Sequence, residues 1–249
     1  MKGRLVRTLG TVLIGAGVLV LMWAFVVWRW QDPATNLYTR WQQRQLTSEF
    51  HDRMEAFRPS PVPAAPDPSE WAAQVRHDAN RYLADSHRGD ALGRLRIPRL
   101  GVNMLLVNGT DRDSLKKGPG RYAGTPRDLD GDAAPPRAYM PGQGQRVYVA
   151  GHRTTYQAPF SHIDHLRPGD VVTLDLPYAR FVYRVTGHRI VASSRLDELR
   201  SRGHEQLVLQ ACHPRFFATH RYLVYASPVQ IRPRGSRQAL PAAELVAAR

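Results

Sequence analysis

The hydrophobic pattern divides the chain into an apolar segment, two amphipathic segments and a long region of short apolar runs. Residues 9–28, LGTVLIGAGVLVLMWAFVVW, carry no charge. This run has the ~20 residues that a helix needs to cross ~30 Å of hydrocarbon. Lys2, Arg4 and Arg7 precede it, so the positive-inside tendency predicts a cytoplasmic N-terminus. Bulky residues follow where a cleavable signal would have a small-x-small site, which favours an uncleaved anchor over a signal peptide.

Residues 31–57 have the spacing of an amphipathic helix. Its apolar positions are Leu37, Trp41, Leu46, Phe50, Met54 and Phe57. Residues 58–68 contain five prolines, which predicts a stiff, extended spacer.

Residues 69–86 predict a second, shorter helix. Ser69 is the expected N-cap, and Trp71, Val75 and Tyr82 share one face. We expect the two helices to form a stalk that lies on the following domain or on the membrane.

From residue 93 the helical spacing stops and short β-like runs begin, separated by Gly and Pro turn signals. These runs are 95–97, 102–107, 146–150, 171–176, 180–192, 206–211 and 222–231. So many short strands predict a mainly β domain, either a sandwich or a closed barrel. We expect one short helix at 196–202 and a frayed or weakly helical tail at 234–249. The predicted units are 1–30, 31–92, 93–233 and 234–249.

The net charge of +14 comes almost entirely from arginine, because only three of the 35 basic residues are lysine. Such a chain suits an anionic partner, either nucleic acid, anionic lipid or a cell-wall polymer. No RNA-binding signature or basic run with interleaved aromatics supports nucleic acid. The single cysteine excludes an internal disulfide, so outside the cytoplasm it is an intermolecular bridge or a reactive thiol.

That cysteine, Cys212, ends an apolar run, and Arg221 opens the next one. A thiol needs a base to act as a nucleophile at neutral pH. His152 is the strongest candidate among ten histidines, since it follows the apolar run 147–150 and Gly151. His213 adjoins the thiol, but neighbouring residues of a strand point to opposite faces. A thiol, a base and a cation at strand ends are a set of residues suited to acyl transfer.

Several dispersed segments resemble the sortase family in order and spacing. They are GRLRIPRL at 93–100, GPGRY at 118–122, PGQG at 141–144, AGHRTTYQAPF at 150–160 and LQAC at 209–212, with Arg221 downstream. The long AGHRTTYQAPF segment and the Cys-His-Pro sequence are most similar to class E sortases of high-GC Gram-positive bacteria.

The resemblance implies an eight-stranded β-barrel and a cysteine transpeptidase that needs no cofactor. Such an enzyme cleaves a Leu-Pro-x-Thr-Gly-like sorting signal, in class E Leu-Ala-x-Thr-Gly, on secreted proteins. It then passes the acyl group to an amine of the peptidoglycan precursor. By position, Cys212 is the nucleophile and His152 the general acid/base, and Arg221 is the donor that stabilises the oxyanion or holds the substrate. Tyr122 and Ala211 are the implied substrate-binding residues.

The chain departs from the family pattern at two motifs. The usual Thr-Leu-x-Thr-Cys reads VLQAC at 208–212, and Arg121 replaces a histidine in GPGRY. The segment 128–139 has alternating aspartates but lacks the glycine and terminal glutamate positions of a calcium loop, so we expect no metal site. Two other functions stay open, a hydrolytic thiol peptidase without transpeptidation and a non-catalytic cell-wall-binding domain.

Overall fold

Eight strands close into a barrel in the computed structural model, which describes residues 2–30, 33–61, 67–129 and 135–242. Around the barrel the order is β6-β5-β1-β2-β3-β4-β7-β8, and a β6–β8 pairing closes the ring. A short strand, β9, extends the sheet beside β8. The strands are β1 (Ala91–Ile97), β2 (Val102–Asn108), β3 (Gly120–Arg121), β4 (Arg146–Ala150), β5 (Val171–Asp175), β6 (Ala179–Ala192), β7 (Gln206–His213), β8 (His220–Pro233) and β9 (Leu240–Pro241).

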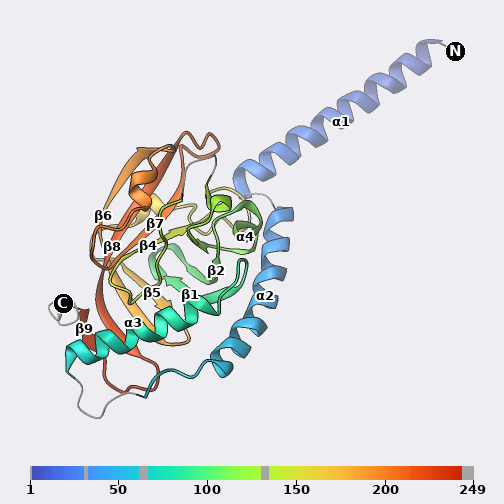
Figure 1. Cartoon of the computed structure of the whole chain (residues 1–249). Coiled ribbons are helices and arrows are strands. Elements are labelled where there is room, and N and C mark those ends of the chain that lie inside the picture. The colour runs from blue at the N-terminus through green and yellow to red at the C-terminus, as the bar shows by residue number, and fades with distance from the viewer. Residues whose placement is uncertain (1, 31–32, 62–66, 130–134, 243–249) are drawn as a thin grey trace.

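The longer helices precede the barrel in sequence and two of them lie against it (Figure 1). Helix α1 projects away from the domain, α2 runs along one side and α3 crosses the face seen in the figure. The helices are α1 (Lys2–Trp30), α2 (Pro33–Ala56), α3 (Pro68–Ala84) and α4 (Arg112–Lys117), with 3-10 turns η1 (Pro98–Leu100), η2 (Pro126–Asp128), η3 (Ile163–His165) and η4 (Leu196–Leu199).

Strand alternation builds the core. In β1, Leu95 and Ile97 are fully buried while Arg94 and Arg96 lie on the outer face. In β5, Val172 and Leu174 point inward. Successive side chains of a strand point to opposite faces, so one row of each strand fills the barrel and the other faces outward.

Helix α3 is part of the folded domain. Its Trp71, Val75 and Tyr82 are buried in the main core, which confirms the predicted helix face. The Tyr82 hydroxyl also donates to the Leu92 carbonyl, 2.9 Å away. The predicted cap was wrong, because Asp67 is the N-cap and accepts from the backbone N–H of Ser69. Asp67 precedes the proline at the first helical position, where a missing N–H costs nothing.

Helix α2 docks on the barrel through apolar residues of its C-terminal half and through polar residues along its length. Leu46 and Phe50 are buried, whereas Leu37 and Trp41 are exposed, so only part of the predicted apolar face is used. The Gln43 side chain accepts from the Leu105 N–H at 2.7 Å and donates to the Leu105 carbonyl at 3.1 Å. An amide group thus satisfies the β2 backbone where a neighbouring strand would otherwise pair.

Helix α1 contains an apolar stretch, Val6–Val26, with a mean hydropathy of 2.3, and none of this stretch is buried in the domain. Its length and composition are compatible with a single membrane span. This agrees with the apolar run predicted at residues 9–28.

The predicted strands and the short helix near residue 196 are confirmed. Apart from the short 3-10 turns η1, η2 and η3, three elements differ from expectation. Helix α4 was not predicted, because its six residues are too few for a period to show. Strand β3 lies inside GPGRY, where glycine and proline indicated a turn. The tail predicted to be frayed instead contributes β9, and residues 243–249 lie outside the described part of the chain.

Candidate functional site

Cys212 and Arg221 face each other across the β7–β8 hairpin. They are Cα partners in the antiparallel register, one step before the His213–His220 pair that ends the ladder. Direct partners in such a pair have Cβ atoms ~4.5–5.5 Å apart. The register therefore brings the thiol and the guanidinium to the same end of the barrel. Cys212 is partly exposed, so this end is open to a reactant.

His152 reaches the same end from the other neighbour of β7. Strands β4 and β7 are parallel, with Ala150 opposite Gln210, and the Gly151 N–H donates to the Gln210 carbonyl at 3.0 Å. His152 follows by one residue, at the level of Cys212. Adjacent strands lie ~4.7–4.9 Å apart. The fold thus brings the predicted nucleophile, base and cation together on three neighbouring strand ends.

The imidazole of His152 is held by packing and has a free nitrogen. Its ring centroid lies 5.0 Å from that of Tyr156. Its Nε2 is buried and has no hydrogen-bond partner among the described residues. Burial lowers the pKa of His152 below its ordinary value, so the neutral imidazole is the resting form at pH 7. A buried, unpartnered nitrogen on a neutral ring can accept a proton from a thiol.

The loop after His152 adopts an uncommon backbone conformation that α2 supports. Tyr156, Gln157 and Ala158 have φ angles of 53°, 61° and 39°, which are costly for residues other than glycine. The Tyr156 N–H donates to Thr35 Oγ1 at 3.0 Å, and the Gln157 N–H donates to Asn36 Oδ1 at 2.6 Å. The first turn of α2 therefore fixes the loop that packs on the base.

Arg153 is a buried residue of this site that the sequence analysis did not single out. It is 5% exposed. Its Nη1 lies 3.1 Å from His213 Nδ1 and 3.4 Å from the Cys212 carbonyl oxygen, which it contacts as a donor. Its Nη2 pairs with Asp164 at 2.9 Å. One guanidinium thus connects the base loop, the end of β7 and η3. The one sequence signal for Arg153 is its position directly after His152. Because the chain contains so many arginines, this position alone does not distinguish it from the others.

Arg221 uses part of its guanidinium to hold the hairpin turn. Its Nη1 donates to the Ala218 carbonyl at 2.7 Å and to the His220 carbonyl at 3.1 Å. A guanidinium has five N–H donors. No hydrogen bond to a described residue is recorded for its Nη2, which leaves donors for a substrate oxygen.

The two residues implied in substrate binding are both buried. Ala211 faces the barrel core and has no exposed surface, so it can meet a substrate only through its backbone. Tyr122 is packed against Tyr148 and Val208, and its hydroxyl donates to the Pro136 carbonyl at 3.1 Å. Burial raises the pKa of Tyr122 to about 12. In this conformation Tyr122 supports the chain around Pro136.

The described residues contain no group of three or more His, Cys, Asp or Glu arranged to hold a metal ion. At the start of the aspartate-rich segment, Asp128 accepts from the Thr110 N–H at 2.6 Å and from the Thr125 N–H at 3.0 Å. This carboxylate therefore organises the surrounding turn. Asp130 and Asp132 lie outside the described residues.

Residues 95–229, more than half of the chain, match the Sortase domain family. The chain belongs to the sortase family. Sortases are cysteine transpeptidases, so this sortase is an enzyme, and the alternative of a non-catalytic wall-binding domain is set aside. The match covers all eight barrel strands except the start of β1 and the end of β8, and it includes Cys212, His152 and Arg221.

Relatives include two classes of sortase. Sortase D of Bacillus subtilis is 30% identical over 154 residues, 60% of this chain and 70% of the relative. Sortase SrtE1 of Streptomyces coelicolor is 27% identical over 240 residues, 92% of this chain and 58% of that protein.

Solved sortases share the fold. The structure of Streptomyces coelicolor sortase E1 with a tripeptide in its active site has a TM-score of 0.52 and 26% identity, covering 60% of this chain and 94% of that one. Clostridium perfringens sortase C with a C-terminal cell wall sorting motif has a TM-score of 0.56 and 21% identity, covering 74% and 98% of the two chains.

Proposed function

We propose that this sortase is membrane-anchored and joins proteins with a Leu-Ala-x-Thr-Gly-like sorting signal to a cell-wall amine. The observation that carries the proposal is the pairing of Cys212 with Arg221 in register, beside the strand end that bears His152. This arrangement sets a nucleophile, a base and a cation around one point, as acyl transfer requires.

In the first half-reaction, the Cys212 sulfur attacks the threonine carbonyl carbon of the signal. Neutral His152 accepts the thiol proton, and Arg221 donates hydrogen bonds to the developing oxyanion. The Thr–Gly bond then breaks, the glycine amine leaves with the proton from His152, and a thioester remains on Cys212. In the second half-reaction, an amine of the peptidoglycan precursor attacks the thioester, loses a proton to His152 and releases the Cys212 thiol.

The proposed substrate is based on the peptides bound to related sortases and on the class E resemblance. One related structure contains a cell wall sorting motif and another a tripeptide, each in its own protein. The class E resemblance of the 150–160 segment favours alanine at the second position of the signal. Tyr122 and the Ala211 backbone are the proposed residues behind this preference.

The proposed anchor is α1, with its basic N-terminal residues in the cytoplasm and the barrel outside. Cys212 is the sole cysteine, so a membrane-impermeant maleimide tests this orientation without engineering. Labelling in intact cells supports it, and labelling only after lysis contradicts it. Cys212→Ala is the control for labelling at other groups.

The catalytic proposal is tested by mass spectrometry on peptides that differ only in Leu-Ala-x-Thr-Gly against Leu-Pro-x-Thr-Gly. We expect an adduct of the acyl half on Cys212, and amide product when an amine is added. Cys212→Ala should fold and form neither. Cleavage by that variant would refute the assignment of the nucleophile. Acid product with every amine would instead favour the hydrolytic peptidase.

A further inference from the structure

A row of charged residues crosses the outside of the barrel, away from the catalytic strand ends. Arg232 on β8 is the register partner of Arg180 on β6. Arg180 is the partner of Asp175 on β5, and Asp175 is the partner of Arg94 on β1. Four adjacent strands thus present three arginines and one aspartate side by side.

A hollow of about 390 Å³ lies over this row. Phe50 and Met54 of α2 form one wall, and the segment 233–236 after β8 forms another. Arg96 and Arg234 also line it. A second hollow of about 160 Å³ shares Arg180 and Arg232 with the first. The volume of the larger hollow is in the range of small-ligand sites.

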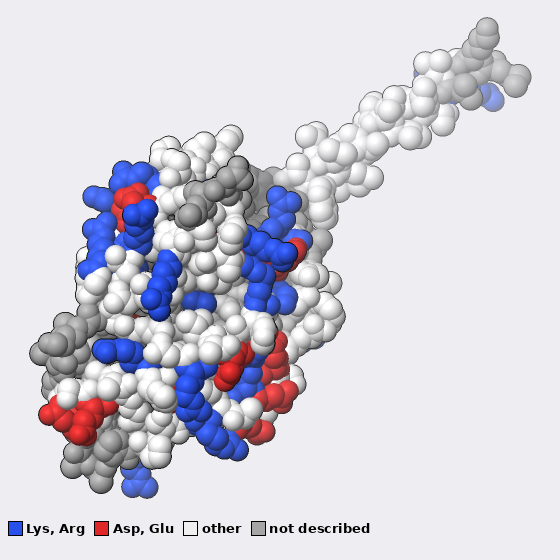
Figure 2. Space-filling view, viewed as in Figure 1, with Lys and Arg blue, Asp and Glu red and all other residues white. Residues whose placement is uncertain are grey.

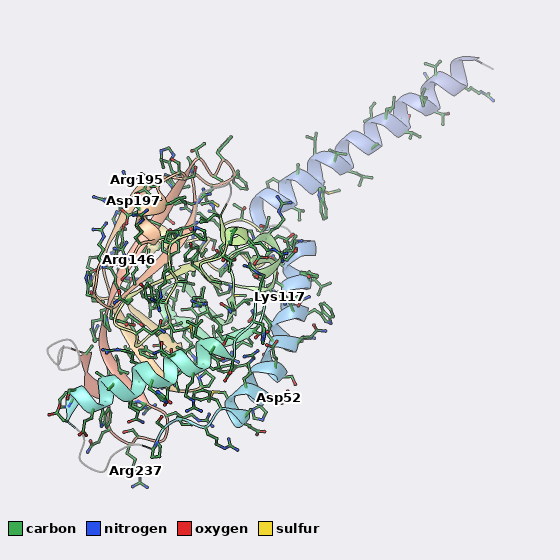
Figure 3. The ribbon with its side chains drawn as sticks, in the orientation of Figure 1. Asp52, Lys117, Arg146, Arg195, Asp197 and Arg237 are labelled. Atoms are coloured by element: carbon green, nitrogen blue, oxygen red, sulfur yellow. The ribbon has the colours of Figure 1, made fainter. Side chains whose placement is uncertain are left out.

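We refer to these five arginines and Asp175 as the arginine cluster. They are Arg94, Arg96, Arg180, Arg232 and Arg234. Figure 2 shows basic side chains in several separate groups rather than one continuous band, so each group must be judged by its own partners. Arg237, labelled in Figure 3, follows the 233–236 wall and lies at the opposite end of the domain from Arg195 and Asp197.

Positive charge in the cluster is not balanced by the described residues. Asp175 is the one carboxylate that lines the hollow, and it pairs with both Arg96 and Arg180. Arg94 donates to the neutral Asn103 side chain at 3.3 Å. The backbone of Arg232 pairs with β6, but its guanidinium has no hydrogen bond or ion pair to a described residue. Burial, followed by repulsion from Arg180 and Arg94, lowers the pKa of Arg96.

Such an arrangement costs stability when it is empty. Like charges directly opposite each other in an antiparallel pair, as Arg180 and Arg232 are, destabilise the sheet. A multivalent anion in the hollow would remove this repulsion. Guanidinium groups match phosphate oxygens with two parallel hydrogen bonds, which favours phosphate over a compact monovalent anion.

We propose that the arginine cluster is a binding site for a phosphate-bearing ligand, separate from the catalytic site. The ligand's phosphate lies over the Arg180–Arg232 pair and accepts hydrogen bonds from Arg94 and Arg96. The two sources of this chemistry are a small free diphosphate and a phosphodiester polymer. The open second hollow beside Arg232 gives a polymer a way to continue past the site.

The test uses the full chain in nanodiscs of zwitterionic lipid, titrated by calorimetry with inorganic pyrophosphate and with a glycerol-phosphate oligomer. We expect both to bind and to raise the melting temperature, and the tighter probe identifies the source. Arg94→Gln with Arg232→Gln should weaken binding at least about tenfold, because charge-assisted bonds are lost. Added salt should weaken binding by the unchanged protein.

The matched control is Arg40→Gln with Arg44→Gln, which removes the same charge from exposed positions on α2. It should bind like the unchanged protein. Equal weakening by both pairs, or no binding of either probe, would overturn the proposal. Neither pair touches the catalytic residues, so peptide cleavage should stay unchanged, and this site can fail independently of the transpeptidase assignment.

Discussion

Replacing Arg153 should slow peptide cleavage by displacing the Cys212 thiol, although Arg153 itself contacts no reacting atom. This side chain contacts the Cys212 carbonyl, the His213 ring and Asp164, but none of its recorded contacts is to a reacting atom. We therefore describe Arg153 as a positioning residue. In Arg153→Gln, the end of β7 should lose the guanidinium contacts to Cys212 and His213. The Cys212 thiol should then move away from His152.

The expected magnitude follows from the contacts. A hydrogen bond to a charged group is worth ~1.5–3 kcal/mol. Two of its hydrogen bonds are long, at 3.4 Å to the Cys212 carbonyl and 3.4 Å from Nε to the Ser161 carbonyl. Asp164 is 43% exposed, so solvent weakens that ion pair. We expect a loss of ~2 kcal/mol in unfolding free energy. A small displacement at the reacting atoms can cost up to ~100-fold in rate, so kcat should fall ~10- to 100-fold with KM little changed.

Steady-state peptide cleavage and urea unfolding measure the two effects separately. Arg153→Lys keeps the charge beside Asp164, but a single ammonium group cannot reach all the partners of the guanidinium. It should recover most of the stability and little of kcat. Values of kcat within about twofold of the unchanged enzyme in both variants would refute the positioning role.

Two further predictions concern α2 and the base loop. Because burial lowers the pKa of His152, the acid limb of kcat/KM should lie below ~6.5, the ordinary histidine value. Tyr156→Gly exposes the His152 ring and should shift the acid limb of the pH profile to higher pH. An unchanged acid limb would contradict burial as the cause of the lowered pKa. Gln43→Ala should cost ~2–4 kcal/mol, since it leaves the Leu105 backbone groups unpaired. Urea unfolding checks this, with Gln42→Ala as the control.

The strands and the three candidate site positions could be predicted because each depends on local signals, whereas the choice of a closed barrel over a sandwich came from the family resemblance. Apolar runs mark strands wherever they occur, and Cys212, His152 and Arg221 stand where such runs begin or end. The register of the strands turned those three positions into one site. The parallel pairing of β4 with β7 leaves no turn signal in the sequence. The expectation that His152 acts together with Cys212 therefore came from the family resemblance.

Other features depend on tertiary contacts that no local pattern contains. The role of Arg153 depends on Asp164 and on the end of β7. The Arg180–Arg232 row exists only because the register aligns two strands about fifty residues apart. Arg121 resembled a simple replacement in a turn, yet it is fully buried and donates to Asn108 at 2.7 Å.

The parallel pairing of β4 with β7 also has a consequence for the order in which the enzyme matures. The β7–β8 hairpin is local, so the cysteine and arginine can meet early in folding. The histidine joins them only across the β5–β6 excursion, and non-local pairings form slowly. Until β4 pairs with β7, we therefore expect Cys212 to lack its proposed base, His152. In the proposed mechanism, the β4–β7 pairing is therefore the step that brings the base to the thiol.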